Sequence, residues 1–235
     1  TRDDSLALLA RYPDLQLGDL PLDFLQHRVP KLLADTLEPA TWPADPRLEW
    51  CPPGHGDLYA ALDATGLLDR LLAAGTTHAF VANADNLGAT LDPRIAAWMQ
   101  LHDVPFVMEV ATRTTNDRKG GHLARRRADH RLVLRESAQT PGSDRAALQD
   151  IGRHRYMNTN NLWLDLRAVR AALDAAGGAL ALPLIRNAKH LDPTDPTSPD
   201  VLQLETAMGA AIELFDDARA LHVPRTRFAP VKTTD

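Results

Sequence analysis

The chain has 235 residues, of which 44% are hydrophobic and 24% charged, and this composition predicts a folded protein and excludes a disordered one. The 26 Lys and Arg against 31 Asp and Glu leave a net charge of −5, which excludes a general attraction to nucleic acid, so any anionic ligand must be held by local cations. Cys51 is the single cysteine, so no disulfide forms within the chain, and together with the lack of a long apolar span or a signal-peptide pattern this predicts a cytoplasmic protein without a membrane partner.

Strand-like apolar runs alternate with helix-like segments along the chain. In chain order, we expect helices at residues 5–12, 58–74, 94–101, 166–176 and 201–221. The expected strands are residues 22–25, 79–82, 106–110, 131–134 and 182–185. Such alternation predicts an α/β domain with a mostly parallel sheet.

The helix expected at residues 201–221 has the clearest pattern. Its apolar residues recur at helical spacing, namely Val201, Leu204, Met208, Ala211, Phe215 and Ala218. Ser198 and Pro199 supply an N-cap and a proline at the first helical position. Between the strands, residues 122–137 resemble a polar hairpin, and the three arginines at 125–127 are read as its solvated turn rather than as a nucleic-acid patch.

The strand expected at residues 79–82 ends abruptly in polar side chains, because Asn83, Asp85 and Asn86 follow it directly. In open parallel sheets, ligands bind beyond the carboxyl ends of the strands, which would place these side chains at a cleft. The alternative is an ordinary turn, since Asn and Asp favour turns for local reasons.

The segment "PPGHGD", residues 52–57, precedes the next expected helix. Its two glycines flank His55 and would let the backbone approach a ligand closely. Asp57 can cap the helix, whose N-terminus favours anions. A Pro-Gly turn with a surface histidine is the alternative.

Glu109 interrupts the apolar strand at residues 106–110. A carboxylate there needs donors, such as sugar hydroxyls or a nearby cation. The alternative is an outward-facing residue on a half-exposed strand. Gly120 and Gly121 follow in a loop and would admit a ligand.

Asparagines and cations form two further candidate segments. Asn158, Asn160 and Asn161 lie together in "MNTNNLW", and amides suit sugar hydroxyls, although a capping turn before the helix at 166–176 is the alternative. In the C-terminal "VPRTRFAPVKT", cations spaced through an irregular segment would offset phosphate charge, or would form a basic surface loop. These cations are Arg225, Arg227 and Lys232.

Several of these segments match one family in the same order along nearly the whole chain. They are "PPGHGDLYAAL", "NADNLGATLD", "KGG", "MNTNNLW", "LETAMGAAI" and "VPRTRFAPVKT". In them the chain closely resembles the eukaryotic-type UTP–glucose-1-phosphate uridylyltransferases, also called UDP-glucose pyrophosphorylases. The resemblance implies a nucleotidyltransferase-like (Rossmann-like) mixed, mostly parallel sheet flanked by helices. It also implies Mg²⁺-dependent, in-line attack of glucose 1-phosphate on the α-phosphorus of UTP, giving UDP-glucose and pyrophosphate.

The resemblance also implies roles for individual residues. The residues implied for UTP are Gln26, which would read uracil, Gly54, Asn83, Asp85 and Lys232. Those implied for the sugar phosphate are His55, Asn83, Asp85 and Asn160, and Glu109 is added to the predicted sugar-phosphate contacts because of its place in an apolar strand. Asp85 would hold the metal ion, and Lys232 would be the catalytic lysine that stabilises the transferred phosphoryl group.

The chain departs from the family pattern at its ends. The family carries an upstream Gly-rich loop, followed by a lysine, that cradles the UTP phosphates, and it continues into a smaller C-terminal β-helical domain. The paired glycines at 120–121 and 177–178 lie in no such loop motif. We therefore expect residues 1–235 to be an incomplete nucleotidyltransferase catalytic domain. Two alternatives remain open: a pyrophosphorylase for another sugar, such as galactose 1-phosphate or N-acetylglucosamine 1-phosphate, and a non-catalytic nucleotide-sugar binding module.

Overall fold

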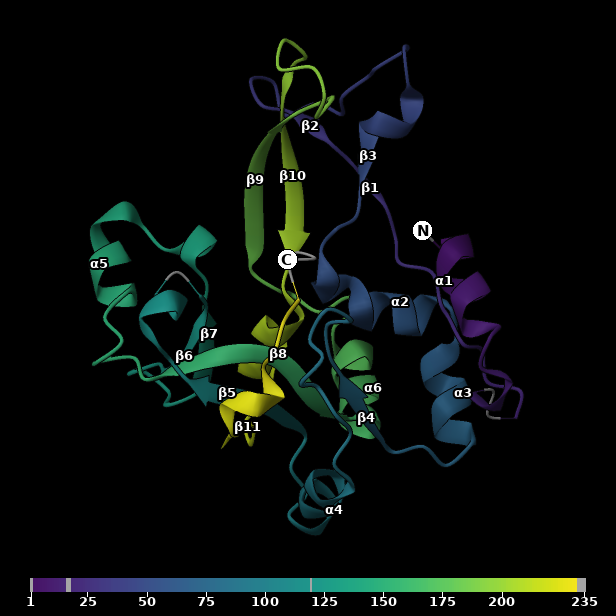
Figure 1. Ribbon diagram of the computed structural model, residues 1–235, viewed down its shortest axis with the longest axis vertical. Coiled ribbons are helices and arrows are strands. Elements are labelled where there is room, and N and C mark those ends of the chain that lie inside the picture. The colour runs from purple at the N-terminus through teal and green to yellow at the C-terminus, as the bar shows by residue number, and fades with distance from the viewer. Residues whose placement is uncertain (1, 16–17, 119, 232–235) are drawn as a thin grey trace.

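The computed structural model describes residues 2–15, 18–118 and 120–231. Its centre is a mixed sheet in the order β11-β5-β8-β6-β7, with β4 paired to β8, and helices lie on it (Figure 1). The strands of this sheet are β4 (His78–Val81), β5 (Phe106–Thr112), β6 (His122–Arg125), β7 (Leu132–Arg135), β8 (Tyr156–Asp165) and β11 (Arg219–His222). The helices are α1 (Arg2–Leu9), α2 (Leu58–Ala64), α3 (Leu67–Ala73), α4 (Pro93–Leu101), α5 (Arg145–Leu148) and α6 (Leu166–Ala175).

The expectation of a mixed sheet flanked by helices is confirmed, but that of a mostly parallel sheet is wrong for the described strands. Only β11 and β5 pair in parallel, whereas β8 runs antiparallel to β4, β5 and β6. Strands β4 and β5 do point the same way with α4 between them in the chain, as the alternation of strand and helix predicts. Because β8 enters between them in the opposite direction, neither pairs with the other.

Two of the expected helices differ from the structure. The helix at 58–74 is divided into α2 and α3 at Gly66, whose φ of 67° lies in the left-handed region that only glycine adopts readily. The helix at 201–221 is wrong: its residues form β10 (Asp200–Thr206), the 3₁₀ helix η7 (Met208–Leu214) and β11. Its apolar stripe is shared between two cores, because Val201 packs beside Leu191 while Met208 packs in the main core.

The other expected helices and most expected strands lie close to their predicted positions, but β8, which pairs with β4, β5 and β6, was not predicted as a strand. Strand β9 (Leu184–His190) begins at the end of the expected 182–185 strand and extends beyond it, and residues 22–25 form no strand. The polar hairpin is confirmed as β6 and β7. No helix in the described ranges is both long and apolar enough to cross a membrane.

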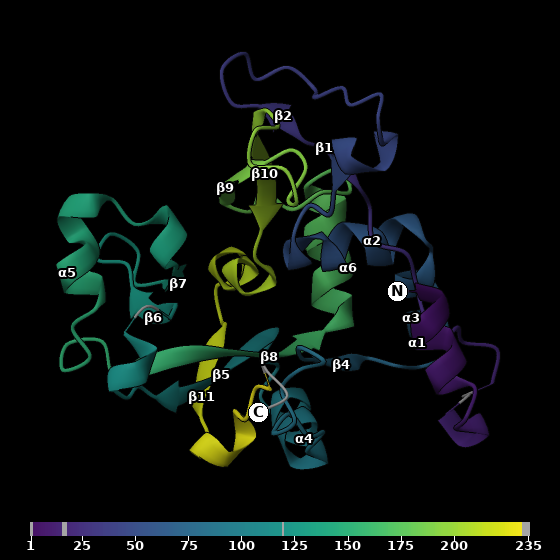
Figure 2. The same ribbon diagram turned by 45° about the horizontal axis from the view of Figure 1, so that its top comes forward.

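An arm rises from the sheet and consists of β9, β10 and the short β2 (Leu32–Leu33), all antiparallel (Figures 1 and 2). Beside it, β1 (Val29–Pro30) pairs with β3 (Trp50–Cys51). The other 3₁₀ helices are η1 (Pro13–Leu15), η2 (Pro46–Glu49), η3 (His55–Asp57), η4 (Thr115–Asp117), η5 (Ser137–Gln139), η6 (Gly142–Asp144) and η8 (Arg225–Arg227).

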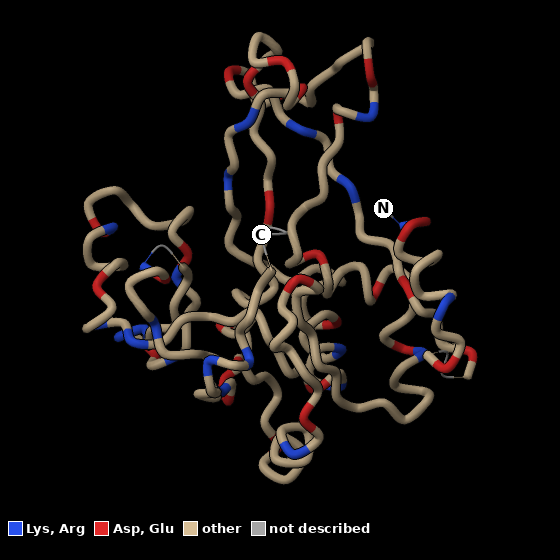
Figure 3. Tube along the Cα trace, in the orientation of Figure 1, with Lys and Arg blue, Asp and Glu red and all other residues tan. Residues whose placement is uncertain are grey.

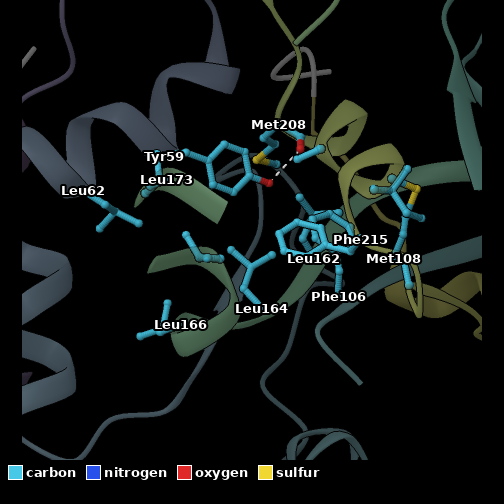
Figure 4. Packing of buried hydrophobic residues seen from close by; sticks show 14 of the residues in the cluster. Tyr59, Leu62, Phe106, Met108, Leu162, Leu164, Leu166, Leu173, Met208 and Phe215 are labelled. Carbon is cyan, nitrogen blue, oxygen red and sulfur yellow. Dashed lines mark hydrogen bonds between the residues drawn. The ribbon is translucent and has the colours of Figure 1, made fainter. Parts of the chain in front are cut away.

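The main core fills the space between the sheet and α2, α3, α6 and η7. Figure 4 shows Phe106 of β5 beside Leu164 of β8, with Tyr59 of α2 reaching toward Met208. The buried hydroxyl of Tyr59 donates to the main-chain oxygen of Met208 at 2.8 Å, so this polar group is satisfied within the core. On the opposite face of the sheet, Trp163 packs in a smaller cluster under α4.

A stacked pair of imidazoles lies beside β6. The rings of His122 and His154 are 4.0 Å apart and inclined by 22°. His122 is fully buried, and within the described ranges neither of its ring nitrogens has a hydrogen-bond partner. Burial, and then the positive charge of His154, Arg113 and Arg135, lower the pKa of His122 to about 3, against a smaller opposite effect of Asp144.

This pair makes the fold acid-sensitive. In the unfolded chain His122 becomes protonated below a pH of about 6.5, whereas in the folded protein it stays neutral down to its pKa of about 3. Between these two pH values the unfolded state binds more protons, so the stability of the fold falls as pH falls. We therefore expect the His122→Phe variant to lose less stability than the native protein between pH 7.5 and pH 4.5, as measured by urea unfolding. His102→Gln, at an exposed position, is the control. An equal loss in native protein and His122→Phe would contradict the prediction.

Candidate functional site

A polar pocket of about 210 Å³ opens where the loop after β4, the middle of β8 and the C-terminal segment meet. Its lining includes three residues predicted from the sequence: Asn83, Asp85 and Asn160. The other lining residues are Asn86, Gly120, Gly121, Glu136, Met157, Asn158, Thr159, Phe228 and Pro230. A larger groove of about 740 Å³ lies along the arm, but none of the predicted site residues lines it. Convergence of polar groups, rather than size, identifies the pocket as the candidate site.

A bulge in β8 shapes one wall of this pocket. Between the pairs Met108–Leu162 and Val110–Asn158 lie one residue of β5 and three of β8. The middle one, Asn160, takes a φ of 57°, which asparagine tolerates better than most residues. The extra residues leave the ladder of main-chain hydrogen bonds, and this turns Asn160 toward the pocket.

Side chains of the bulge replace the lost ladder bonds. The amide of Asn158 accepts from the Asn160 main-chain nitrogen at 2.8 Å and donates to the Asn160 side-chain oxygen at 2.7 Å. The Thr159 hydroxyl donates to the main-chain oxygen of Glu109 at 2.8 Å. The segment "NTNN" is therefore neither a plain strand nor the capping turn considered as the alternative.

The loop after β4 is joined to the C-terminal segment. Asn86 is buried, and its side chain donates to Asn161 Oδ1 and to the Arg227 main-chain oxygen, both at 3.1 Å. Its Oδ1 accepts from the main-chain nitrogen of Ala229 at 2.8 Å. Nearby, the Val231 nitrogen donates to the main-chain oxygen of Asp85 at 2.8 Å. The predicted catalytic Lys232 comes next in the chain and lies outside the described residues.

Glu109 is not brought to the pocket. Its side chain is fully buried on the β5 face that packs under α4, and its carboxylate accepts from Arg227, Trp163 and Asn161. The nearby cation expected as one possible partner is therefore present, whereas the outward-facing alternative is wrong. The assignment of Glu109 as a sugar-phosphate contact is corrected for the same reason: protein donors already occupy both of its oxygens.

Arg225 and Arg113 also hold loops in place. Arg225 binds the carboxylate of Asp117 through two hydrogen bonds of 2.8 and 2.9 Å. Arg113 is buried and donates to the main-chain oxygens of Asp117 and Arg118, at 3.1 and 2.8 Å, as well as to two others from residues 148 and 154. Both arginines thus anchor the loop that leads to Gly120 and Gly121.

Glu136 is the pocket residue that reasoning from the sequence missed. It follows β7, and its carboxylate lies so close to Gly121 that a Cβ at this glycine would collide with it. In the described part of the chain the carboxylate has no ion-pair or hydrogen-bond partner, and burial raises its pKa above the usual range. An acceptor with no partner that lines a polar pocket is suited to a ligand hydroxyl. Nothing in "LRES" marks it, because a glutamate after a hairpin strand is usually solvated.

A second group of predicted residues lies at the base of the arm. The Gln26 side-chain nitrogen donates to the main-chain oxygen of Gly54 at 2.7 Å. Gly54 has a φ of 81°, and a Cβ there would lie 2.5 Å from the Thr206 oxygen, so only glycine allows β10 to pass so closely. Asp57 does not cap α2 as expected, because its carboxylate accepts from the main chain and ring of His27.

His55 connects this second group with the pocket. Its Nδ1 accepts from the Met208 main-chain nitrogen at 3.0 Å, and desolvation lowers the pKa of the ring, which favours the neutral form that this contact requires. The next residue, Gly209, is in contact with the pocket wall, since a Cβ there would lie 3.4 Å from Asn158 Nδ2. The two groups are therefore joined through η7.

The charge and donor set of the pocket limit what it can bind. Lys and Arg are interspersed with Asp and Glu along the trace (Figure 3). In the ranges that the structure describes, no group of three or more His, Cys, Asp or Glu is arranged to hold a metal ion. Asp85 nevertheless places a carboxylate in the pocket beside the amide of Asn83. This set fits an ion such as Mg²⁺ that is bound by one or two carboxylates together with ligand phosphates, and does not form a closed cage.

Comparison with known proteins gives one consistent family. A family model described as UTP–glucose-1-phosphate uridylyltransferase matches residues 1–235. The protein of that name from Astragalus penduliflorus is 38% identical over 238 residues, covering all of this chain and 48% of its own length. The one from Saccharomyces cerevisiae is 42% identical over 211 residues, covering 89% of this chain and 41% of its own. The chain thus spans about half the length of these relatives.

Solved structures of the same kind share the fold. A mutant UDP-glucose pyrophosphorylase from Leishmania major superposes with a TM-score of 0.91 at 46% identity, covering 98% of this chain and 51% of its own. A second mutant of that enzyme, in complex with UDP-glucose, gives 0.90 at 48% identity, covering 97% and 50%. At this identity the similarity extends beyond fold to sequence.

The unpaired carboxylate of Glu136 yields a prediction on stability. Because its pKa is raised, the folded state holds a proton that the unfolded state has released, so its contribution to stability falls as pH rises from about 4.5 through the raised pKa. We expect Glu136→Gln to have a higher urea midpoint than the native protein at pH 8 and no such advantage at pH 4. Glu38→Gln, an exposed glutamate, should change neither value. A lower midpoint for Glu136→Gln at pH 8 would show that the charge has a stabilising partner.

Proposed function

The chain belongs to the UTP–glucose-1-phosphate uridylyltransferase family, and on this premise we propose that it carries the site at which UTP and glucose 1-phosphate form UDP-glucose and pyrophosphate. The observation that carries the proposal is the convergence of Asp85, Glu136 and the bulged Asn160 on one pocket. A relative of 48% identity and the same fold is solved with UDP-glucose bound, which supports a nucleotide sugar as the ligand.

The sugar end of the pocket is the wall formed by β8 and Glu136. Asn158 and Asn160 supply amide donors and acceptors, and Glu136 supplies an acceptor to which no donor in the described part of the protein is bound. A hydroxyl that donates to Glu136 would stabilise its charged form and so recover part of its desolvation cost. Hydrogen bonds of this kind fix the orientation of a hexose, which is how the pocket would select its substrate.

The phosphate end is the loop of Asn83 and Asp85. Asp85 would hold Mg²⁺ together with the ligand phosphates, and the ion would supply charge neutralisation on the transferred group. An oxygen of the sugar phosphate forms the new bond to the α-phosphorus of UTP, and pyrophosphate leaves with the electron pair of the bond that breaks. No covalent protein intermediate is required, so this chain contributes positioning and electrostatic stabilisation. Lys232 stays a prediction for the cationic partner.

The uracil end is the pair of Gln26 and Gly54, and His55, which is predicted to contact the sugar phosphate, follows Gly54 in the chain. The side-chain nitrogen of Gln26 donates to the main-chain oxygen of Gly54, which fixes the orientation of the amide. The side-chain oxygen of Gln26 is then left to accept from an N–H group of the base. His55 is held neutral by its contact with Met208 and so presents no charge at Nδ1.

The buried free thiol of Cys51 fits a reducing, cytoplasmic setting, which we include in the proposal.

A pyrophosphate-release assay on the full-length gene product tests the function. With UTP and Mg²⁺, turnover should be fastest with glucose 1-phosphate among glucose, galactose and N-acetylglucosamine 1-phosphates. Turnover confined to the N-acetylated sugar would replace glucose by that substrate. Calorimetric binding of UDP-glucose without turnover would favour a nucleotide-sugar binding module.

Asp85→Asn tests the metal role. The amide keeps the size of the side chain but is a poor Mg²⁺ ligand, so we expect kcat to fall by about 100-fold with little change in melting temperature. The main-chain contact of Asp85 with Val231 does not depend on the side chain and should persist. Rates are to be measured across a Mg²⁺ titration, with Glu38→Gln as the control. Native rates at limiting Mg²⁺ would remove Asp85 from the metal site.

A further inference from the structure

We infer that Glu109 is a positioning residue, which acts through Arg227 to hold the C-terminal segment, residues 225–231, against the loop of Asp85 and Asn86. Its effect on turnover rests on the proposed function, whereas its effect on the segment does not. Glu109 would not touch substrate, because its carboxylate is fully buried and engaged with protein donors.

The carboxylate of Glu109 binds three side chains from two elements. Oε1 accepts from Arg227 Nη2 at 2.6 Å and from Trp163 Nε1 at 2.8 Å. Oε2 accepts from Arg227 Nε at 2.8 Å and from Asn161 Nδ2 at 3.0 Å. The two contacts with Arg227 form a fork, and such bidentate geometry fixes orientation as well as distance.

Arg227 in turn joins three segments of the chain. Its Nη1 and Nη2 also donate to the hydroxyl and main-chain oxygen of Thr90, at 3.0 and 2.8 Å. Its own main-chain oxygen accepts from Asn86 Nδ2 at 3.1 Å and from Asn161 Nδ2 at 3.3 Å. The guanidinium therefore ties β5 and the loop after β4 to the C-terminal segment.

Asn86 carries this arrangement on to the pocket. It accepts from the Ala229 nitrogen, pairs with Pro230 across a β-bridge, and lies next to Asp85, whose main-chain oxygen accepts from Val231. Phe228 and Pro230 of the same segment line the pocket. A shift of Arg227 would thus move one pocket wall relative to Asp85.

The energetics favour a positioning role over a purely stabilising one. A buried ion pair adds little stability over apolar packing of the same volume, because desolvation of both charges offsets their attraction. What it adds is a defined geometry, since each charge must be met by its partner. Glu109 also contacts Asn161 of the β8 bulge, so one carboxylate orders two walls of the pocket.

The experiment compares three variants of the full-length enzyme. Glu109→Gln removes the charge and one half of the fork. Glu109→Gln combined with Arg227→Met removes both charges, and so removes the penalty of an unpaired buried guanidinium without restoring the fork. Asp63→Asn breaks the ion pair of Asp63 with Arg170, which joins α2 to α6 away from the pocket, and is the matched control.

Three readouts are taken. The indole proton resonance of Trp163 reports whether its contact with Glu109 is changed. Hydrogen exchange at the Ala229 and Val231 amides reports whether the segment has loosened. The separation of kcat from KM for UTP and glucose 1-phosphate reports the effect on turnover.

We expect Glu109→Gln to shift the Trp163 resonance, to speed exchange at both amides and to lower kcat by about 100-fold, the effect of a small misplacement at a site. KM for both substrates should change much less. In the double variant, stability should recover while exchange stays fast and kcat stays low. Asp63→Asn should leave exchange and kcat as in the native enzyme.

Two results would overturn the inference: native exchange at Ala229 and Val231 in Glu109→Gln, or a kcat that recovers together with stability in the double variant. If Glu109→Gln does not fold, Arg227→Lys, which keeps the charge but loses the fork, gives the same comparison. A native enzyme without uridylyl transfer would instead refute the proposed function, and the exchange data would still test the segment.

Discussion

The bulge in β8 opposite Glu109 of β5 is the constraint on which the pocket depends. One residue of β5 faces three of β8 between their flanking pairs, so the main-chain ladder is interrupted at Glu109. Every polar group released by this interruption needs another partner, because the site is buried. The hydroxyl of Thr159 donates to the main-chain oxygen of Glu109, and the side-chain oxygen of Asn158 accepts from the main-chain nitrogen of Asn160, so side chains of "NTNN" supply partners there.

Parts of the fold follow from local pattern and parts do not. The strands β4 and β5 and the helix α4 between them were predictable, since strand and helix periodicities are local. The strand β8 was not predicted at all, and its direction does not follow from local pattern, because a strand buried on both faces has the same pattern whether its neighbours are parallel or antiparallel. The helix expected at residues 201–221 was wrong for a related reason. Its apolar residues recur at helical spacing, but the strand β10 forms there because it pairs with β9 and β2, which lie elsewhere in the chain.

The same distinction applies to the candidate site. Asn83, Asp85 and Asn160 were predicted because polar residues follow or precede apolar runs there and because these segments resemble one family, and the structure brings all three to one pocket. From the sequence, Arg225 and Arg227 were read as cations for a ligand. In the fold they bind the carboxylates of Asp117 and Glu109, which are more than a hundred residues away in the chain, and a sequence does not show such pairs. Glu136 was missed because its environment exists only in the folded chain. There its carboxylate lies against Gly121, and no donor in the described residues binds it. Residues whose role is set by a distant partner are therefore the ones that pattern alone misassigns.

The main chain of Met208 connects the base of the arm with the pocket. Its nitrogen donates to His55 and its oxygen accepts from Tyr59, so both ends are held by the segment "GHGDLY". Gly209, the next residue, has no side chain and so allows η7 to lie against Asn158. Because packed interiors shift between discrete arrangements and do not deform smoothly, a change at His55 that moved Met208 would be felt at Asn158 and, through its two hydrogen bonds, at Asn160. The base of the arm and the pocket are in this way joined by contacts at the start of η7.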